Sequence, residues 1–145
     1  MKVDIRFFNG QTDWAWVMKQ VAILRVEDTG GMVAVNQETG ELLAACIWDN
    51  WTKNSVQCHF IVIDKAALKH GFVEEIADYI FNHQGKKFIY GMVPGDNEKA
   101  LKINEHLGFT VKMRLEDAWA DGVDYVVMEL KKENCPYFPK IKKVA

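Results

Sequence analysis

The segment at residues 97–109, NEKALKINEHLGF, constrains the fold of this chain more than any other. Asp96 or Asn97 can cap the start of a helix there, because a short side-chain oxygen accepts a hydrogen bond from the unpaired amides of the first turn. Four apolar residues then recur at roughly helical spacing: Ala100, Leu101, Ile103 and Leu107. Gly108 comes where a left-handed C-terminal cap is favoured. The pattern therefore predicts one short helix with a defined end.

Strand-like and helix-like runs surround this helix in a definite order. Apolar runs, alternation and turn residues predict strands at 3–8, 32–36, 42–48, 56–63, 87–93, 110–118 and 123–130. Helical spacing predicts two further helices, one capped by Thr12 or Asp13 and one from about 68 to 83. We expect a single α/β domain in the order strand, helix, three strands, helix, strand, helix and hairpin.

Length and charge limit the classes of function. The chain has 145 residues, 49% of them hydrophobic, which suits one domain with a proper core. Its net charge of −2 gives no support for a surface that binds nucleic acid. Residues 131–145 carry five Lys and one Glu, so this end is basic. We divide the chain into one domain at 1–130 and a basic C-terminal tail at 131–145, either solvated or docked on an acidic partner.

The cysteines and the N-terminus indicate the compartment. Cys46, Cys58 and Cys135 are odd in number and lack the spacing of a zinc site, so we expect no metal. Residues 1–6 do not form a signal peptide, and no apolar run is long enough to span a bilayer. We expect a cytoplasmic protein without a membrane partner.

An Asn that opens a short helix ending in Leu107, Gly108 and Phe109 resembles the fourth-helix segment of the GNAT superfamily of N-acetyltransferases. The order of elements over residues 3–130 resembles that superfamily as well. The resemblance implies a GNAT-like fold, in which helices flank a mixed, mostly antiparallel sheet of about seven strands that splays between strands 4 and 5. The chain also resembles, more loosely, compact GNAT-like proteins of some bacteriophages.

The resemblance implies acetyl-CoA as a substrate. Its pantetheine arm would pair with the backbone of Ile61, Val62 and Ile63, and Asn97 would contact the pantetheine amides. Its pyrophosphate would lie on the start of the next helix, where unpaired amides and the positive end of the dipole favour an anion. The residues at that start are Lys69, His70, Gly71, Phe72 and Val73.

This helix start also departs from the family pattern. The family has Arg or Gln, two residues, Gly, one residue, and then Gly or Ala. With Gly71 as the first glycine, Leu68 and Val73 occupy the other two positions. Glu74 and Glu75 add negative charge that repels a pyrophosphate. A working phosphate site and an ordinary solvent-facing helix entry both stay open.

Acetyl transfer to an amine needs a base for the amine and a proton for the leaving thiolate. His59 is the candidate base, because histidine ordinarily titrates near pH 6.5; a packed strand histidine is the alternative. The family often places an acidic Tyr seven residues after the helix-opening Asn, and this chain has Asn104 there. Asn donates a hydrogen bond but gives up no proton near neutral pH. Tyr90 replaces this acid only if it points into the cleft.

The acceptor pocket has three candidates from the first helix and from a polar turn: Trp16, Asp49 and Trp51. Asp49 and Trp51 would offer an acidic, aromatic rim to a cationic amine. Their alternative is a polar turn beside tryptophans at the edge of the core.

Two hypotheses follow. The first is an N-acetyltransferase that moves an acetyl group from acetyl-CoA to an amine of a small molecule or protein. The second is a catalytically degenerate GNAT-fold structural or binding protein, for which Leu68, Val73 and Asn104 argue. A different acyl group and a homodimer also stay open.

Overall fold

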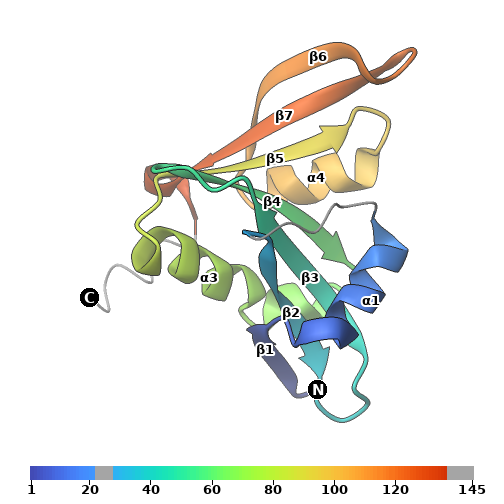
Figure 1. Ribbon diagram of the computed structural model, residues 1–145, viewed down its shortest axis with the longest axis vertical. Coiled ribbons are helices and arrows are strands. Elements are labelled where there is room, and N and C mark those ends of the chain that lie inside the picture. Colours follow the sequence, from blue (N-terminus) through green and yellow to red (C-terminus); the bar gives the residue numbers. More distant parts are fainter. Residues whose placement is uncertain (22–27, 137–145) are drawn as a thin grey trace.

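Seven strands form one sheet in the computed structural model, which describes residues 1–21 and 28–136 (Figure 1). The spatial order is β1-β2-β3-β4-β5-β7-β6. The strands are β1 (Val3–Phe7), β2 (Gly30–Asn36), β3 (Leu42–Asp49), β4 (Ser55–Val62), β5 (Phe88–Pro94), β6 (Thr110–Ala120) and β7 (Val123–Lys131). Neighbouring strands are antiparallel except β4 and β5, which are parallel. The predicted mixed, mostly antiparallel sheet is confirmed.

Strands β4 and β5 pair at one end only. Their register comprises Ser55 with Phe88, Val56 with Ile89 and Gln57 with Tyr90. Beyond Gln57 the two strands diverge, and Figure 1 shows them as the arms of a V. The predicted splay between strands 4 and 5 is therefore confirmed.

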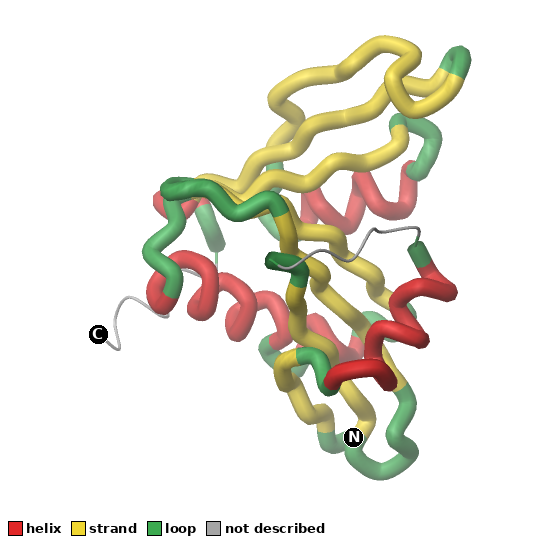
Figure 2. Tube along the Cα trace, in the orientation of Figure 1, coloured by secondary structure: helices red, strands yellow, loops and turns green. Residues whose placement is uncertain are grey.

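Helices cover both faces of the sheet (Figure 2). Helix α1 (Gly10–Gln20) lies on one face, where Trp14 and Val17 pack against Val33, Ala45 and Ile47. On the other face, the main core gathers apolar residues of α3 (Phe72–Ala77), the π-helical turn η1 (Asp78–His83) and α4 (Glu98–His106). The chain therefore has three layers, with the sheet in the middle.

The predicted helix at 68–83 is interrupted. The structure has a short α2 (Ala66–Lys69), a break at Gly71, and then α3 followed by η1. Gly71 has φ of 89°, a left-handed conformation that ends one helix before the next begins. The prediction of one continuous helix from 68 to 83 was therefore wrong. The spacing of apolar residues does not reveal that one residue has a left-handed backbone. Thr12 or Asp13 as the first cap was also wrong, since α1 begins at Gly10.

Helix α4 forms as its sequence predicts. The Asn97 side chain accepts a hydrogen bond from the Ala100 amide at 3.1 Å, so Asn97 is the cap. Gly108 has φ of 103°, and a Cβ atom there would come within 2.7 Å of Pro136. Glycine is therefore required by both conformation and space, and it turns the chain so that Phe109 is buried.

The first residues of the predicted basic tail belong to the domain. Strand β7 runs to Lys131, a 3₁₀ turn η2 spans Lys132–Asn134, and Cys135 is buried. The Lys132 amide donates to the Lys87 carbonyl. Residues 137–145 of the tail lie outside the described residues. Across the described part of the chain, no helix is long and apolar enough to cross a membrane.

Candidate functional site

A cavity of about 310 Å³ lies where β4 and β5 diverge. Residues 58–63 form one wall and residues 91–94 form the other. Helix α4 and its cap supply Asn97, Lys99, Ala100, Ile103 and Asn104, and the end of α1 supplies Gln20 and Val21. Because the lining residues come from helices on opposite faces of the sheet, the cavity extends through the gap between the strands.

The edge of β4 offers backbone groups to this gap. Ile63 donates its amide to the Leu43 carbonyl at 2.9 Å, and backbone groups of an antiparallel strand face alternate neighbours. Ile61 and Ile63 therefore face β3, whereas Phe60 and Val62 face β5 beyond the end of its pairing. Of the three residues predicted to hold pantetheine, Val62 presents its backbone to the gap. Sequence reasoning missed Phe60.

His59 and Asp49 come together on the α1 face of the sheet. They lie diagonally across β3 and β4, since Ile47 pairs with His59 and Asp49 pairs with Gln57. His59 Nε2 lies 3.5 Å from Asp49 Oδ1, and the two side chains are 22% and 15% exposed. Asp49 Oδ1 is buried and has no hydrogen-bond partner among residues 1–21 and 28–136. A buried carboxylate oxygen without a donor favours positive charge beside it.

Gln57 does not satisfy Asp49, although the two residues are directly opposite. The Gln57 Oε1 atom accepts instead from Asn50 Nδ2 at 2.8 Å. Asn50 has φ of 51°, so the chain turns at this residue immediately after β3. His59, which lines the cavity, is therefore the ionisable group that Asp49 faces.

Asn104 lies on the opposite side of the cavity, on α4. Its side chain is 7% exposed, and Nδ2 contacts Met128 Sδ at 3.7 Å as a weak donor. Asn97 lines the same cavity, but its Oδ1 already accepts from the Ala100 amide. The side of the gap formed by α4 thus offers amide groups and no group that releases a proton near neutral pH.

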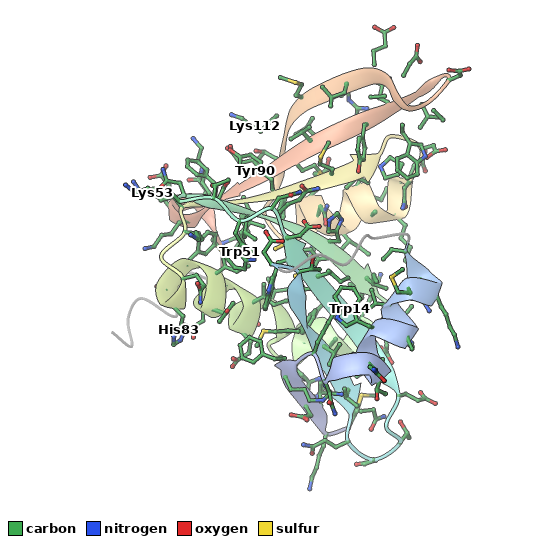
Figure 3. All side chains as sticks on the ribbon, viewed as in Figure 1. Trp14, Trp51, Lys53, His83, Tyr90 and Lys112 are labelled. Atoms are coloured by element: carbon green, nitrogen blue, oxygen red, sulfur yellow. The ribbon has the colours of Figure 1, made fainter. Side chains whose placement is uncertain are left out.

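Tyr90 points away from the gap and toward β7. Its hydroxyl donates to Glu129 Oε2 at 2.7 Å, and Lys112 Nζ lies 3.8 Å from Glu129 Oε1 (Figure 3). Burial, and then the contact with Glu129, raises the pKa of Tyr90 above its ordinary value. Tyr90 does not line the cavity, so the idea that it replaces the missing acid is wrong.

The predicted acceptor-side tryptophans do not join the cavity lining. Trp16 is half-buried against the cluster beneath α1. Trp51 donates its Nε1–H to the Asp28 carbonyl and packs edge-on against Trp48. Figure 3 shows Trp14 on α1, and its side chain is buried. Of the three acceptor candidates, only Asp49 is brought to His59.

In the loop predicted to hold the pyrophosphate, several backbone amides donate hydrogen bonds to other groups of the chain. The Leu43 carbonyl accepts from both Ile63 and Asp64, and Asp64 Oδ1 accepts from Ala66 at 2.9 Å. His70 Nδ1 is bonded to the Ala66 carbonyl at 2.7 Å. Lys69 and His70 are exposed, while the side chains of Phe72 and Val73 are buried in the core. Only backbone groups of the last two could reach a ligand.

A carboxylate lies beside the start of α3. Glu74 Oε2 is 3.6 Å from the position that a Cβ atom on Gly71 would take. This oxygen is buried and has no hydrogen-bond partner in the described chain. No side chain caps α3. The helix start therefore keeps unpaired first-turn amides, but a negative charge is already close to them.

The pairing of His59 with Asp49 had a signal in the sequence. The turn between the strands fixes the register of β3 and β4, and the period of two places residues 47, 49, 57 and 59 on one face. The sequence therefore indicates that the two side chains share a face, but their contact follows only once the register of β3 and β4 is known. Within the described ranges, no cluster of three or more His, Cys, Asp or Glu side chains could hold a metal ion.

No protein-family model and no curated protein sequence matches this chain. Solved structures are similar to it. Mutant forms of the spermidine/spermine N-acetyltransferase SpeG from Vibrio cholerae match with a TM-score of 0.74 and 14% identity, over 96% of this chain and 99% of SpeG. SpeG in complex with manganese ions gives 0.72 and 13%, over 99% of this chain and 98% of SpeG.

A GNAT-family protein from Desulfovibrio desulfuricans matches with a TM-score of 0.70 and 13% identity, over 90% of this chain and 99% of that protein. Sequence identities this low support a conclusion about the fold alone. The strand order, the single parallel pair and the splay agree with these likenesses. This chain has the fold of the GNAT superfamily of N-acetyltransferases.

Proposed function

We propose that this protein is an N-acetyltransferase that moves an acetyl group from acetyl-CoA to an amine. The observation that carries the proposal is the position of His59, which lines the gap between β4 and β5 and faces the buried Asp49 oxygen. This arrangement places a candidate base beside a space open to an extended ligand.

The gap suits the acyl-bearing arm of the donor. Acetyl-CoA supplies an activated acetyl group as a thioester. The backbone groups of Phe60 and Val62 face the gap, and an extended arm with two amides can pair with them as an added strand would. The cavity volume of about 310 Å³ is at the lower end of the range for small-ligand pockets.

His59 would act as the general base. An amine attacks a carbonyl only when it is neutral, so a proton must leave an ammonium acceptor. The His59 ring takes that proton, and Asp49, whose Oδ1 lies 3.5 Å from Nε2, stabilises the imidazolium that results. The new C–N bond then forms as the C–S bond breaks, and the second proton that the nitrogen loses passes through water to the leaving thiolate.

Asn104 would assist the leaving thiolate without protonating it. Its side-chain amide lines the gap on the side away from His59 and can donate a hydrogen bond to sulfur. The proton of the free thiol then comes from water.

A cationic amine is the acceptor class that Asp49 favours. Asp49 Oδ1 is buried and accepts no hydrogen bond within the described residues, although His59 Nε2 lies 3.5 Å away, so the carboxylate can attract an ammonium group before proton transfer. SpeG, which has the same fold, is a spermidine/spermine N-acetyltransferase. A polyamine is therefore the first acceptor to test, followed by peptide and lysine amines.

The test is an acetyl-transfer assay with acetyl-CoA, a panel of amines, and the variants His59→Ala and His83→Ala. Loss of a general base costs about 10²- to 10⁴-fold in rate, so His59→Ala should fall by that much. His83 is exposed and contacts Asp78 on η1, away from the gap, so its variant is the matched control. Equal activity of the two variants would exclude His59 as the base.

A structural or binding protein is the second candidate, and the closed loop after β4 favours it. It predicts no acetyl-CoA binding up to millimolar concentration in a calorimetric titration. Micromolar binding together with acetyl transfer to an amine would exclude it in favour of the enzyme.

A further inference from the structure

Between residues 63 and 70 the chain bonds the amides that a phosphate would need, and at the start of α3 a buried Glu74 oxygen lies beside the free amides. We propose that this protein recognises its donor by the pantetheine arm alone, so that it takes acyl thioesters of pantetheine with or without the nucleotide of CoA. This inference rests on the proposed function, because it concerns the donor of the same site.

Six amides between residues 63 and 70 are already bonded within the chain. Backbone carbonyls or the Asp64 side chain accept from the amides of Ile63, Asp64, Ala66, Ala67, Leu68 and His70. A phosphate is held by a loop only when several amides converge on it without other partners. Between 63 and 70 this condition fails.

Two carboxylates lie where a pyrophosphate would have to approach. Asp64 Oδ1 already bonds the Ala66 amide at 2.9 Å, as an anion would. Glu74 Oε2 lies beside Gly71 at the start of α3, buried and without a hydrogen-bond partner in the described chain. The buried Glu74 oxygen therefore opposes a pyrophosphate at the start of α3, whereas the exposed Asp64 acts mainly by occupying the Ala66 amide.

The nearby cations do not reverse this balance. Lys65 and Lys69 are exposed and can turn into solvent, and the His70 ring is bonded to the Ala66 carbonyl. Exposed charges on flexible side chains contribute little to binding and are screened by salt. The nucleotide end of CoA is therefore left in solvent.

In the gap between β4 and β5, by contrast, backbone groups remain available to a ligand. Phe60 and Val62 keep backbone groups that face the space, and the cavity is open beside them. The acyl group passes from sulfur to the acceptor nitrogen, and pantetheine leaves as a free thiol. The leaving group needs no phosphate for this step.

The experiment compares two donors that differ only in the nucleotide and phosphates. Calorimetry gives the dissociation constants of acetyl-CoA and S-acetylpantetheine for the full chain, at low and high salt. We expect a ratio below about tenfold, or 1.4 kcal/mol, at both salt concentrations. A ratio above tenfold in favour of acetyl-CoA would overturn this inference and leave the proposed function standing.

A third outcome separates the two proposals. If neither donor binds up to millimolar concentration, the proposed function fails, and the inference fails with it. If both bind alike, a transfer assay with S-acetylpantetheine should show a kcat within about tenfold of that with acetyl-CoA, since both present the same thioester.

Discussion

Strand β4 and the loop that follows it would both face the proposed donor, yet they differ in how far the chain satisfies its own polar groups. In the gap, β4 and β5 part after Gln57, and the backbone of Phe60 and Val62 has no strand beside it. In the loop, carbonyls and the Asp64 carboxylate bond the amides in turn. Backbone groups without a partner in the chain are available to bind a ligand, whereas groups that are already hydrogen-bonded are not.

The difference has a cause in the sequence. The parallel pairing of β4 and β5 ends at Gln57 and Tyr90, so the edge of β4 beyond Gln57 stays open, and α4 lines the gap that results. The loop closes because Asp64 and Gly71 allow two turns to form around α2. The gap between β4 and β5 thus depends on the topology of the sheet, whereas the hydrogen bonding of the loop depends on its own residues.

Filling the gap should have the largest effect on binding. Ala100 lines the cavity from α4, and Ala100→Trp would place a large ring in it. We expect acetyl-CoA affinity to fall at least about 100-fold, close to 3 kcal/mol. Calorimetry checks this, with the exposed Glu105→Trp on the same helix as control. Unchanged binding of the Ala100 variant would place the donor elsewhere.

Neutralising Asp49 should have the next largest effect. Asp49→Asn removes the charge that faces His59 at 3.5 Å and keeps the shape. Proton transfer and attraction of the ammonium group should both weaken, so we expect kcat to fall about 10- to 100-fold and KM for the amine to rise. Asp121→Asn, in the exposed turn after β6, is the control. A rise in KM with kcat unchanged would assign Asp49 to acceptor binding alone.

Removing the Tyr90 hydroxyl should change stability and not the rate. Tyr90→Phe deletes the donor at 2.7 Å from the buried Glu129 carboxylate. We expect a loss of about 1–3 kcal/mol in the free energy of unfolding. Denaturant unfolding and the transfer assay are the measurements. A large loss of kcat in a folded variant would return Tyr90 to the role of acid.

Neutralising Glu74 should have the smallest effect, which is a gain in affinity for acetyl-CoA. Glu74→Gln removes one charge beside the start of α3, where a charge is worth about 0.3–1 kcal/mol. We expect acetyl-CoA to bind about 2- to 5-fold more tightly and S-acetylpantetheine to be unaffected. A loss of acetyl-CoA affinity would show that Glu74 holds the donor rather than opposing it.

Much of the fold could be predicted from the sequence because its signals are local. The cap at Asn97, the turn at Gly108 and the alternation in the strands each depend on a few neighbouring residues. The break at Gly71 could not be predicted, since its left-handed backbone depends on how α2 and α3 both pack on the sheet.

The candidate site was predicted only in part. His59 and Asp49 were both singled out, but their contact depends on the register across β3 and β4. Phe60 was missed, because the direction of a backbone amide follows from hydrogen bonding with Leu43 and not from residue type. Trp51 packs against Trp48 and does not line the cavity, so its assignment to the acceptor pocket stays a prediction.

Amide chemical shifts test the central claim most directly. Labelled protein is titrated with acetyl-CoA, and the amides of Phe60 and Val62 are followed in the gap beside those of residues 66–74 in the loop. We predict that shifts concentrate at Phe60, Val62 and the lining of α4, with the loop nearly unchanged. Shifts that concentrate in the loop, or none at all, would contradict the account.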